Sequence, residues 1–169
     1  DIVAPGVVST HGPHVTQFCA AEPDPQTAGM ADDLAQMLGD AGLETRVNPY
    51  VDRVIWAKVS FNCAMNSLCA LLGRTPGPLL DDPEIKALVM ATIMEGCDVA
   101  AAAGVYVDRE ALRNTIEMVH REHRDHKPSM LVDVENGRRT EIDSLNGAVV
   151  TTGQRLGVET PRNQTLLAL

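Results

Sequence analysis

The chain has 169 residues, of which 44% are hydrophobic, 22% are charged and only 3% are aromatic. This length allows one domain with a proper core, or a domain plus a short piece of a neighbour, and the composition excludes a disordered tail. The formal net charge of -9 excludes an electrostatic attraction to nucleic acid or to an anionic membrane surface. With so few aromatic residues the core has to be built from aliphatic side chains, which favours closely packed helices.

The first 50 residues show short strands around one helix. Residues 1–23 are rich in Val, Thr and Gly and alternate in short runs, which predicts strands joined by turns. Residues 25–42 carry apolar side chains at helical spacing and end at Gly42, and residues 43–47 return as a short strand. This order is a β-β-α-β remnant without a first strand and its phosphate loop.

The remaining residues predict helices. Residues 51–72 are nearly all apolar or small, which is typical of a helix buried on every side. A second helix is predicted over residues 82–104, started by Asp82-Pro83 and ended by a glycine, and a third over residues 108–123. A polar loop is then expected over residues 124–139.

A fourth helix is expected from Thr140 to Gly157, and another begins at Pro161. Thr140 and Asp143 form a variant of the capping box, in which Thr140 is the N-cap. Glu141 and Asp143 also complement the positive end of the helix dipole.

No apolar run approaches the roughly 18 to 20 residues that a membrane span needs, and no basic-then-apolar leader opens the chain, so we expect a cytoplasmic protein without a membrane partner. The four cysteines form no CxxC pair, and we expect them to be reduced core residues. His120, His123 and His126 rotate around a helix at their spacing of three, so we expect no metal site.

Lys58, Asn62 and Asn66 form a polar stripe on the otherwise apolar helix. Their spacing of four and four puts all three on one face, within about 80° of arc. Burying these groups without partners would cost several kcal/mol, so the stripe has to meet polar protein groups, a water-filled cleft or a ligand. A structural network and a functional site both remain open at this point.

A second polar set lies near Ser129 and Glu141, and each member has a plain structural explanation. Ser129 can shape a loop, Glu141 and Asp143 can serve the start of a helix, and Arg138 can be solvated. The residue types alone do not separate these roles from a binding site.

Taken together, these residues resemble the C-terminal domain of the ketopantoate reductase (2-dehydropantoate 2-reductase) family. The resemblance covers the chain from about Gly6 to Asn163, and it depends on the ordered set more than on any single motif. The matching pattern is Trp56-x-Lys58-x3-Asn62-x3-Asn66, Ser129-Met130, Asp133, Thr140-Glu141-Ile142-Asp143-x2-Asn146-Gly147 and Thr160-Pro161-x-Asn163.

The resemblance implies a mostly α fold, similar to the 6-phosphogluconate dehydrogenase C-terminal-like fold, preceded by the end of a Rossmann domain. Residues 1–50 would be the remnant of the dinucleotide-binding domain, and residues 51–169 the helical substrate-binding domain. It implies reduction of 2-dehydropantoate to pantoate, in pantothenate biosynthesis, by hydride transfer from NADPH. No G-x-G-x-x-G follows a strand, so cofactor-binding residues are not identified and the fragment alone is expected to be inactive.

The resemblance also implies roles for single residues. Lys58 matches the general acid, which donates a proton to the carbonyl oxygen as negative charge develops there. Glu141 matches the acid that helps to position substrate, cofactor and Lys58, whose partial burial on the apolar helix we expect. Asn62 and Asn66 match residues that orient the substrate, and Ser129 matches the contact to the substrate carboxylate.

Two other interpretations of function stay open. The chain could belong to a reductase of another 2-keto acid, because the basic pair His126-Lys127 before Ser129 could alter which acid fits. It could instead be a helical dimerisation module without a catalytic task, as the run of four alanines at residues 100–103 allows close packing. A homodimer is compatible with each interpretation.

Overall fold

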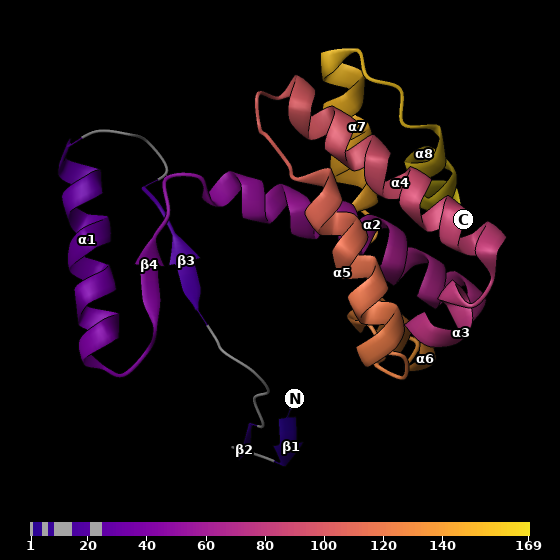
Figure 1. Ribbon diagram of the computed structural model, residues 1–169, viewed down its shortest axis with the longest axis horizontal. Coiled ribbons are helices and arrows are strands. Elements are labelled where there is room, and N and C mark those ends of the chain that lie inside the picture. Colours follow the sequence, from indigo (N-terminus) through magenta and orange to yellow (C-terminus); the bar gives the residue numbers. More distant parts are fainter. Residues whose placement is uncertain (1, 5–6, 9–14, 21–24) are drawn as a thin grey trace. The chain divides into compact units, whose positions relative to one another are not determined.

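A computed structural model describes residues 2–4, 7–8, 15–20 and 25–169 of the chain (Figure 1). The other residues of the opening segment, for which strands and turns are expected, lie outside this description. The chain divides into two compact units, Asp1–Val51 and Asp52–Leu169, and each is considered by itself.

The first unit contains the expected strands and helix. Strands β1 (Ile2–Ala4) and β2 (Val7–Val8) pair antiparallel. Strand β3 (Thr16–Phe18) pairs in parallel with β4 (Thr45–Val47), and α1 (Pro25–Asp40) connects them as a crossover (Figure 1). The predicted order of β3, α1 and β4 is therefore confirmed. The apolar stripe of α1 is largely uncovered, since two strands of three residues offer little surface, and the exposed fractions are 64% for Met30, 45% for Leu34 and 69% for Met37.

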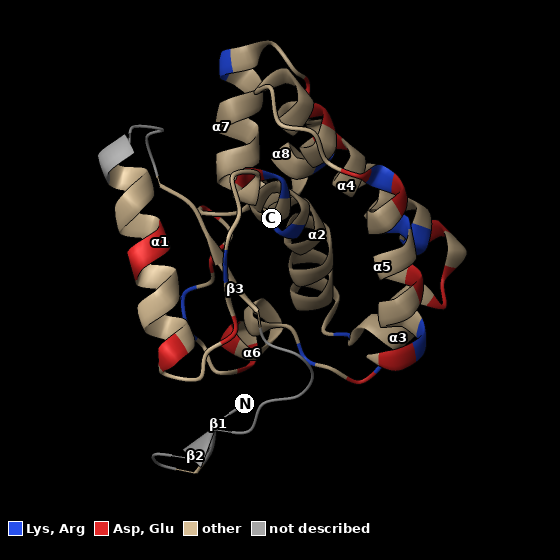
Figure 2. Ribbon diagram, turned by 60° about the vertical axis from the view of Figure 1, so that its left-hand side comes forward, with Lys and Arg blue, Asp and Glu red and all other residues tan. Residues whose placement is uncertain are grey.

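The second unit is helical. Its described elements are α2 (Val51–Leu72, which begins at the boundary), α3 (Pro76–Leu80), α4 (Pro83–Ala102), α5 (Arg109–Glu122), α6 (Ser129–Glu135), α7 (Asn146–Leu156) and α8 (Pro161–Ala168). The mostly α fold class is confirmed. Figure 2 shows acidic and basic residues together on α5, whose apolar side chains Leu112 and Ile116 are buried.

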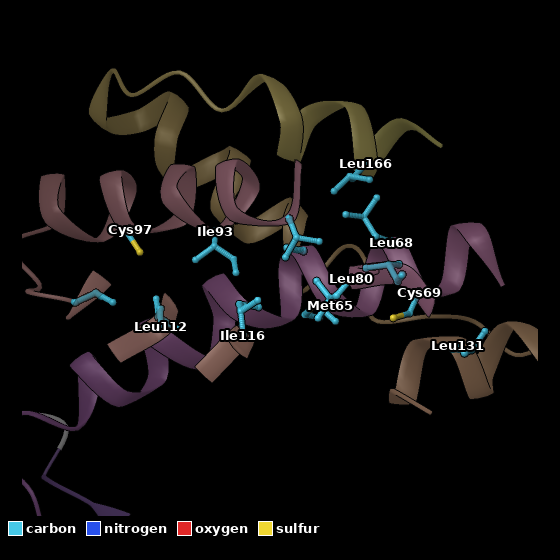
Figure 3. Packing of buried hydrophobic residues seen from close by; sticks show 14 of the residues in the cluster. Met65, Leu68, Cys69, Leu80, Ile93, Cys97, Leu112, Ile116, Leu131 and Leu166 are labelled. Carbon is cyan, nitrogen blue, oxygen red and sulfur yellow. The ribbon is translucent and has the colours of Figure 1, made fainter. Parts of the chain in front are cut away.

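The core forms around the second half of α2. Met65 and Leu68 of α2 belong to one buried cluster with Ile93 of α4 and Ile116 of α5, and all four residues are at most 3% exposed (Figure 3). Burial raises the pKa of the Cys63 and Cys69 thiols to about 12, so both stay protonated. All four cysteines are free, as expected, but Cys19 is only partly buried, so the expectation of a core residue is wrong for Cys19.

The first half of α2 differs from its second half. Val54 is 45% exposed and Ile55 is 50% exposed, so the expectation that the helix is buried on every side is wrong for this half. By length and composition α2 is the one helix among the described residues that could cross a membrane, a test that core helices of soluble proteins also pass. Its buried apolar residues are Cys63, Ala64, Met65, Leu68 and Cys69, so the apolar composition of the second half serves the core.

Helix ends set by local capping are predicted correctly. Asp82 accepts hydrogen bonds from the backbone N–H groups of Glu84 and Ile85, and Asp108 caps α5 in the same way. Gly157 ends α7 with a φ of 71°, a left-handed conformation that favours glycine.

Two predictions between α5 and α7 are wrong. The expected loop over residues 124–139 contains the helix α6, because Met130 and Leu131 are buried against the core at 2% exposure each. Thr140 is not an N-cap, since α7 begins only at Asn146. Turns precede α7, in which the Glu141 carbonyl oxygen accepts from the N–H groups of Ser144 and Leu145.

Candidate functional site

Three of the residues singled out in the sequence meet in one hydrogen-bonded cluster. Ser129 Oγ donates to Glu141 Oε1 at 2.6 Å. Asn66 Nδ2 lies 3.3 Å from the same Glu141 oxygen and 3.4 Å from Ser129 Oγ. The cluster thus joins α2, α6 and the turn that precedes α7, across 63 to 75 residues of sequence.

The other two residues of the stripe do not join this cluster. Lys58 is exposed and Asn62 is half-buried, and neither side chain makes a hydrogen bond or ion pair with another described residue. The expected partial burial of Lys58 is wrong, because Lys58 lies in the uncovered half of α2. The stripe therefore runs from solvent at Lys58 down to the core at Asn66, which is 6% exposed.

Neighbouring apolar residues hold the cluster in place. Met130, next to Ser129, packs into a buried group with Cys63 of α2, Leu145 and Val149. Asn66 is followed by further buried residues of α2, so the two donors, Asn66 and Ser129, are both next to residues that are buried in the helical unit. Ser129 and Glu141 themselves reach the surface.

A second polar network lies deeper and explains Asn146 and Asn163 of the pattern as structural residues. Ser67 Oγ donates to Asn146 Oδ1 at 2.8 Å, and Asn146 Nδ2 donates to the Cys63 carbonyl and to Asn163 Oδ1. Asn163 Nδ2 then donates to Glu95 Oε2 at 2.8 Å. This chain of buried groups connects α2, α7, α8 and α4, and so fixes the frame on which the cluster is built.

Sequence reasoning missed Glu95, which is 6% exposed and anchors this network. Its carboxylate accepts from the backbone N–H groups of Arg162 and Asn163, and from the Arg162 guanidinium at 3.0 Å. The sequence contained a signal for this role, because a carboxylate among the apolar residues of α4 requires buried hydrogen-bond partners.

The basic residues near Ser129 are paired with acids of their own. Lys127 contacts Glu135 at 2.7 Å, and Arg138 contacts Asp133 at 2.9 Å. The Lys127 charge is thereby offset locally, which weakens the expectation that this basic pair selects the substrate. His120 contacts Asp81, and no group of metal-binding side chains occurs among the described residues.

A cavity of about 390 Å³ lies beside the cluster. Asn66, Ser129 and Glu141 do not line this cavity. It is lined instead by their neighbours in the chain, which are Ser67, Met130, Thr140 and Ile142. The cluster is therefore not part of this cavity.

Chemically, the cluster is an anchored carboxylate. Two donors converge on Glu141 Oε1, while Oε2 has no hydrogen-bond partner among the described residues. Such a carboxylate can accept a hydrogen bond from a ligand hydroxyl or hold a nearby ammonium group in place.

Comparisons with known proteins identify the family of the chain. The family described as "Ketopantoate reductase PanE/ApbA C terminal" matches residues 50–169. The 2-dehydropantoate 2-reductase of Streptococcus pyogenes serotype M3 is 35% identical over 158 residues, which cover 93% of this chain and 51% of that protein. The chain thus spans about half the length of the curated relatives that it matches.

Solved structures show the same fold. A PanE/ApbA family ketopantoate reductase from Ralstonia eutropha JMP134 has a TM-score of 0.81 and 29% identity, over 99% of this chain and 54% of that one. A D-mandelate dehydrogenase, solved with NADH and anilino(oxo)acetate, has a TM-score of 0.84 and 27% identity, over 95% of this chain and 66% of that one. The match of the family to most of the chain shows that this protein belongs to the ketopantoate reductase family and contains its C-terminal domain.

Proposed function

We propose that the chain is the substrate-binding half of a reductase that converts 2-dehydropantoate to pantoate with NADPH. The observation that carries this proposal is the joining of Asn66, Ser129 and Glu141, from three separate elements, at the inner end of the stripe that begins at Lys58. A stripe with only a structural role would have no need for an anchored carboxylate that reaches the surface.

NADPH would supply the hydride to the carbonyl carbon. The 169 residues contain no glycine-rich phosphate loop, so the cofactor does not fit this chain alone, and the chain's own residues serve the substrate. As hydride arrives, negative charge develops on the carbonyl oxygen, and a proton donor there lowers the barrier. We assign this role to the Lys58 ammonium.

Glu141 would hold the substrate by accepting a hydrogen bond from one of its hydroxyl groups. Lys58 and Asn66 are eight residues apart on one helix, so their Cα atoms differ by about 12 Å in height along its axis. A bound 2-keto acid would lie between the lysine and the cluster. Asn62, one turn from each, can donate to or accept from it.

Ser129 is the proposed contact to the substrate. Its single hydroxyl hydrogen is given to Glu141, so in this arrangement it offers lone pairs to a substrate hydroxyl. To donate to the substrate carboxylate, which is the contact that the resemblance implies, Ser129 would first have to release Glu141.

The decisive variant is Lys58→Ala in the full-length protein, assayed with 2-dehydropantoate and NADPH. We expect kcat to fall by about 10² to 10⁴, the usual contribution of a general acid. The melting temperature should hardly change, because Lys58 is exposed and unpaired among the described residues. Lys86→Ala is the control, since Lys86 pairs with Glu117 on α5 and should not affect turnover. If Lys58→Ala turned over the substrate as fast as the parent does, the result would favour the interpretation of the chain as a non-catalytic dimerisation module.

The similarity to D-mandelate dehydrogenase favours one alternative, a reductase of another 2-keto acid. A panel of 2-dehydropantoate, ketoisovalerate, pyruvate and phenylglyoxylate, each with NADPH and with NADH, separates the two. The proposed substrate is wrong if 2-dehydropantoate is reduced no better than the other acids.

A further inference from the structure

The segment that carries Glu141 returns along α6 toward the start of that helix. Ser129 is the first residue of α6, and Glu141, 12 residues later, accepts the hydrogen bond from its hydroxyl group. The chain therefore reverses its direction after α6 ends at Glu135 and comes back to Ser129. The contacts that hold this reversal determine where the Glu141 carboxylate lies.

The backbone reverses at the C-terminal end of α6. The Arg138 N–H donates to the Asp133 carbonyl oxygen at 2.8 Å, and the Gly137 N–H donates to the Val134 carbonyl oxygen at 3.0 Å. Gly137 has a φ of 63°, which is the left-handed conformation that this way of ending a helix requires. The turn thus brings Arg138 back to the residue five positions earlier, Asp133.

The side chains of Asp133 and Arg138 close the same turn a second time. Nε and Nη2 of Arg138 each lie 2.9 Å from Asp133 Oδ1, and the Asp133 side chain is only 25% exposed. Asp133 follows Ser129 by four residues, so the two lie next to each other on one face of α6. That face is therefore linked to the returning segment twice, from Ser129 to Glu141 and from Asp133 to Arg138.

The next basic residue does not make such a link. Arg139 pairs with Asp143, which belongs to the returning segment itself, and the two side chains are 88% and 65% exposed. Arg138 and Arg139 are thus adjacent residues of equal charge, but only Arg138 is attached to α6.

We propose that Asp133 and Arg138 are positioning residues, which hold Glu141 against Ser129 and act on the substrate only through Glu141. This inference rests on the proposed function. A carboxylate that has to meet a substrate in a defined geometry gains from support by residues that do not touch the substrate.

The first test is a charge reversal and its rescue in the full-length protein, assayed with 2-dehydropantoate and NADPH. Arg138→Glu brings two carboxylates together and should push the returning segment away from α6, so we expect kcat/KM to fall about tenfold. Asp133→Arg should have a similar effect. The double variant Asp133→Arg/Arg138→Glu restores an ion pair and should return kcat/KM to within about threefold of the parent.

Arg139→Glu is the matched control. It makes the same change of charge at the adjacent residue, whose partner Asp143 is not part of α6. We expect kcat/KM to change less than about twofold, because an exposed ion pair contributes little.

A mutant cycle tests whether the effect passes through Glu141. Once Glu141→Ala has removed the carboxylate, nothing is left for the pair to position. Adding Arg138→Glu to this background should therefore lower kcat/KM by no more than about twofold. A residue that touched the substrate itself would cause its full tenfold loss in both backgrounds.

A further readout needs no catalysis. The N–H groups of Ser144 and Leu145 donate to the Glu141 carbonyl oxygen, so their hydrogen exchange reports how firmly the segment is held. We expect Arg138→Glu to accelerate the exchange of these two amides about tenfold and the double variant to reverse the effect. The amides in the buried half of α2 should exchange as in the parent, which separates a local change from a loss of global stability.

Three outcomes would overturn the inference. These are an unchanged kcat/KM in Arg138→Glu, a double variant that stays as impaired as the single ones, and an equal loss with and without the Glu141 side chain. If Arg138→Glu does not fold, Arg138→Ala replaces it in the cycle, with an expected loss of about two- to fivefold. A parent that reduces no 2-keto acid would instead refute the proposed function, and hydrogen exchange would still decide whether the pair holds the segment.

Discussion

At the scale of single residues, Gly96 allows α4 to pack directly on α2. A Cβ atom at this position would lie 2.5 Å from Ser60 Oγ, 2.9 Å from Ser60 Cβ and 3.2 Å from Ser60 Cα. Two of these atoms cannot move without moving the backbone of α2. The absence of a side chain at Gly96 therefore sets the separation of the two central helices.

We expect Gly96→Ala to lower the free energy of unfolding by about 1 to 3 kcal/mol, the usual cost of overpacking a core. Gly147→Ala is the control, because a Cβ there meets its nearest atom, Leu167 Cδ1, only at 3.7 Å, and alanine favours helix. Urea unfolding followed by the fluorescence of Trp56, the only tryptophan, measures both. Equal stability of the two variants would show that the helices separate without cost.

The sequence could predict which residues share a face but not how deep each lies. The spacing of Lys58, Asn62 and Asn66 determines their alignment, because helix geometry is local. Whether such a face is covered depends on packing by elements far away in the sequence. The burial of Asn66 and the exposure of Lys58 were therefore beyond prediction, as was the partner Glu141, 75 residues from Asn66.

At the scale of elements, α3 and α5 are joined through Asp81 at the end of α3. Asp81 contacts the Arg124 guanidinium at 2.7 Å and His120 at 2.9 Å. The hydrogen bond to Arg124, and to a smaller extent the one to His120, lower the pKa of Asp81 to about 2. Since the pKa is lower in the folded protein than in the unfolded one, the ionised form stabilises the fold.

Asp81→Asn should therefore lower the melting temperature at neutral pH. This contribution is fully present above about pH 4, where Asp81 is ionised even when unfolded, and it is lost as the pH falls toward 2. Melting curves of parent and variant between pH 2 and 7 should converge at the acidic end. Asp98→Asn, a carboxylate of similar exposure with one arginine partner, is the control and should have the smaller effect. A difference as large at pH 2 as at pH 7 would contradict this role.

Elements whose ends depend on neighbouring residues were predictable, and elements that depend on distant packing were not. Asp82 and Asp108 reach backbone groups only two and three residues ahead, so their caps can be recognised in the sequence. Helix α6 has seven residues, and its buried Met130 and Leu131 are adjacent, so no helical period is visible. Its form follows from burial against the core, which the sequence around it does not reveal.

At the scale of the whole molecule, the hydrophobic core belongs to the second unit. Every residue of the two core clusters lies beyond the boundary at Asp52. Ala31 is the only buried hydrophobic residue that the structure describes in the first unit. Stability should therefore reside in residues 52–169.

We expect residues 52–169, expressed alone, to remain helical and to unfold cooperatively, since they contain the whole core and both polar networks. Residues 1–51 should show no cooperative transition, because the strands and the helix that the structure describes there bury too little apolar surface. Circular dichroism during heating measures both. A fragment 52–169 that melts gradually would show that the first unit supports the core.

Helix α2 is also a rigid element, and the Asn66 end of its polar stripe is anchored to Glu141. Each residue turns a helix by about 100°, so inserting one residue between Lys58 and Asn66 would swing Lys58 about a quarter of the circumference away while leaving Asn66 attached to Glu141. The buried end of α2 thereby determines the direction in which the Lys58 ammonium points. In this segment a substitution changes one side chain, whereas an insertion changes the direction of every side chain that precedes it.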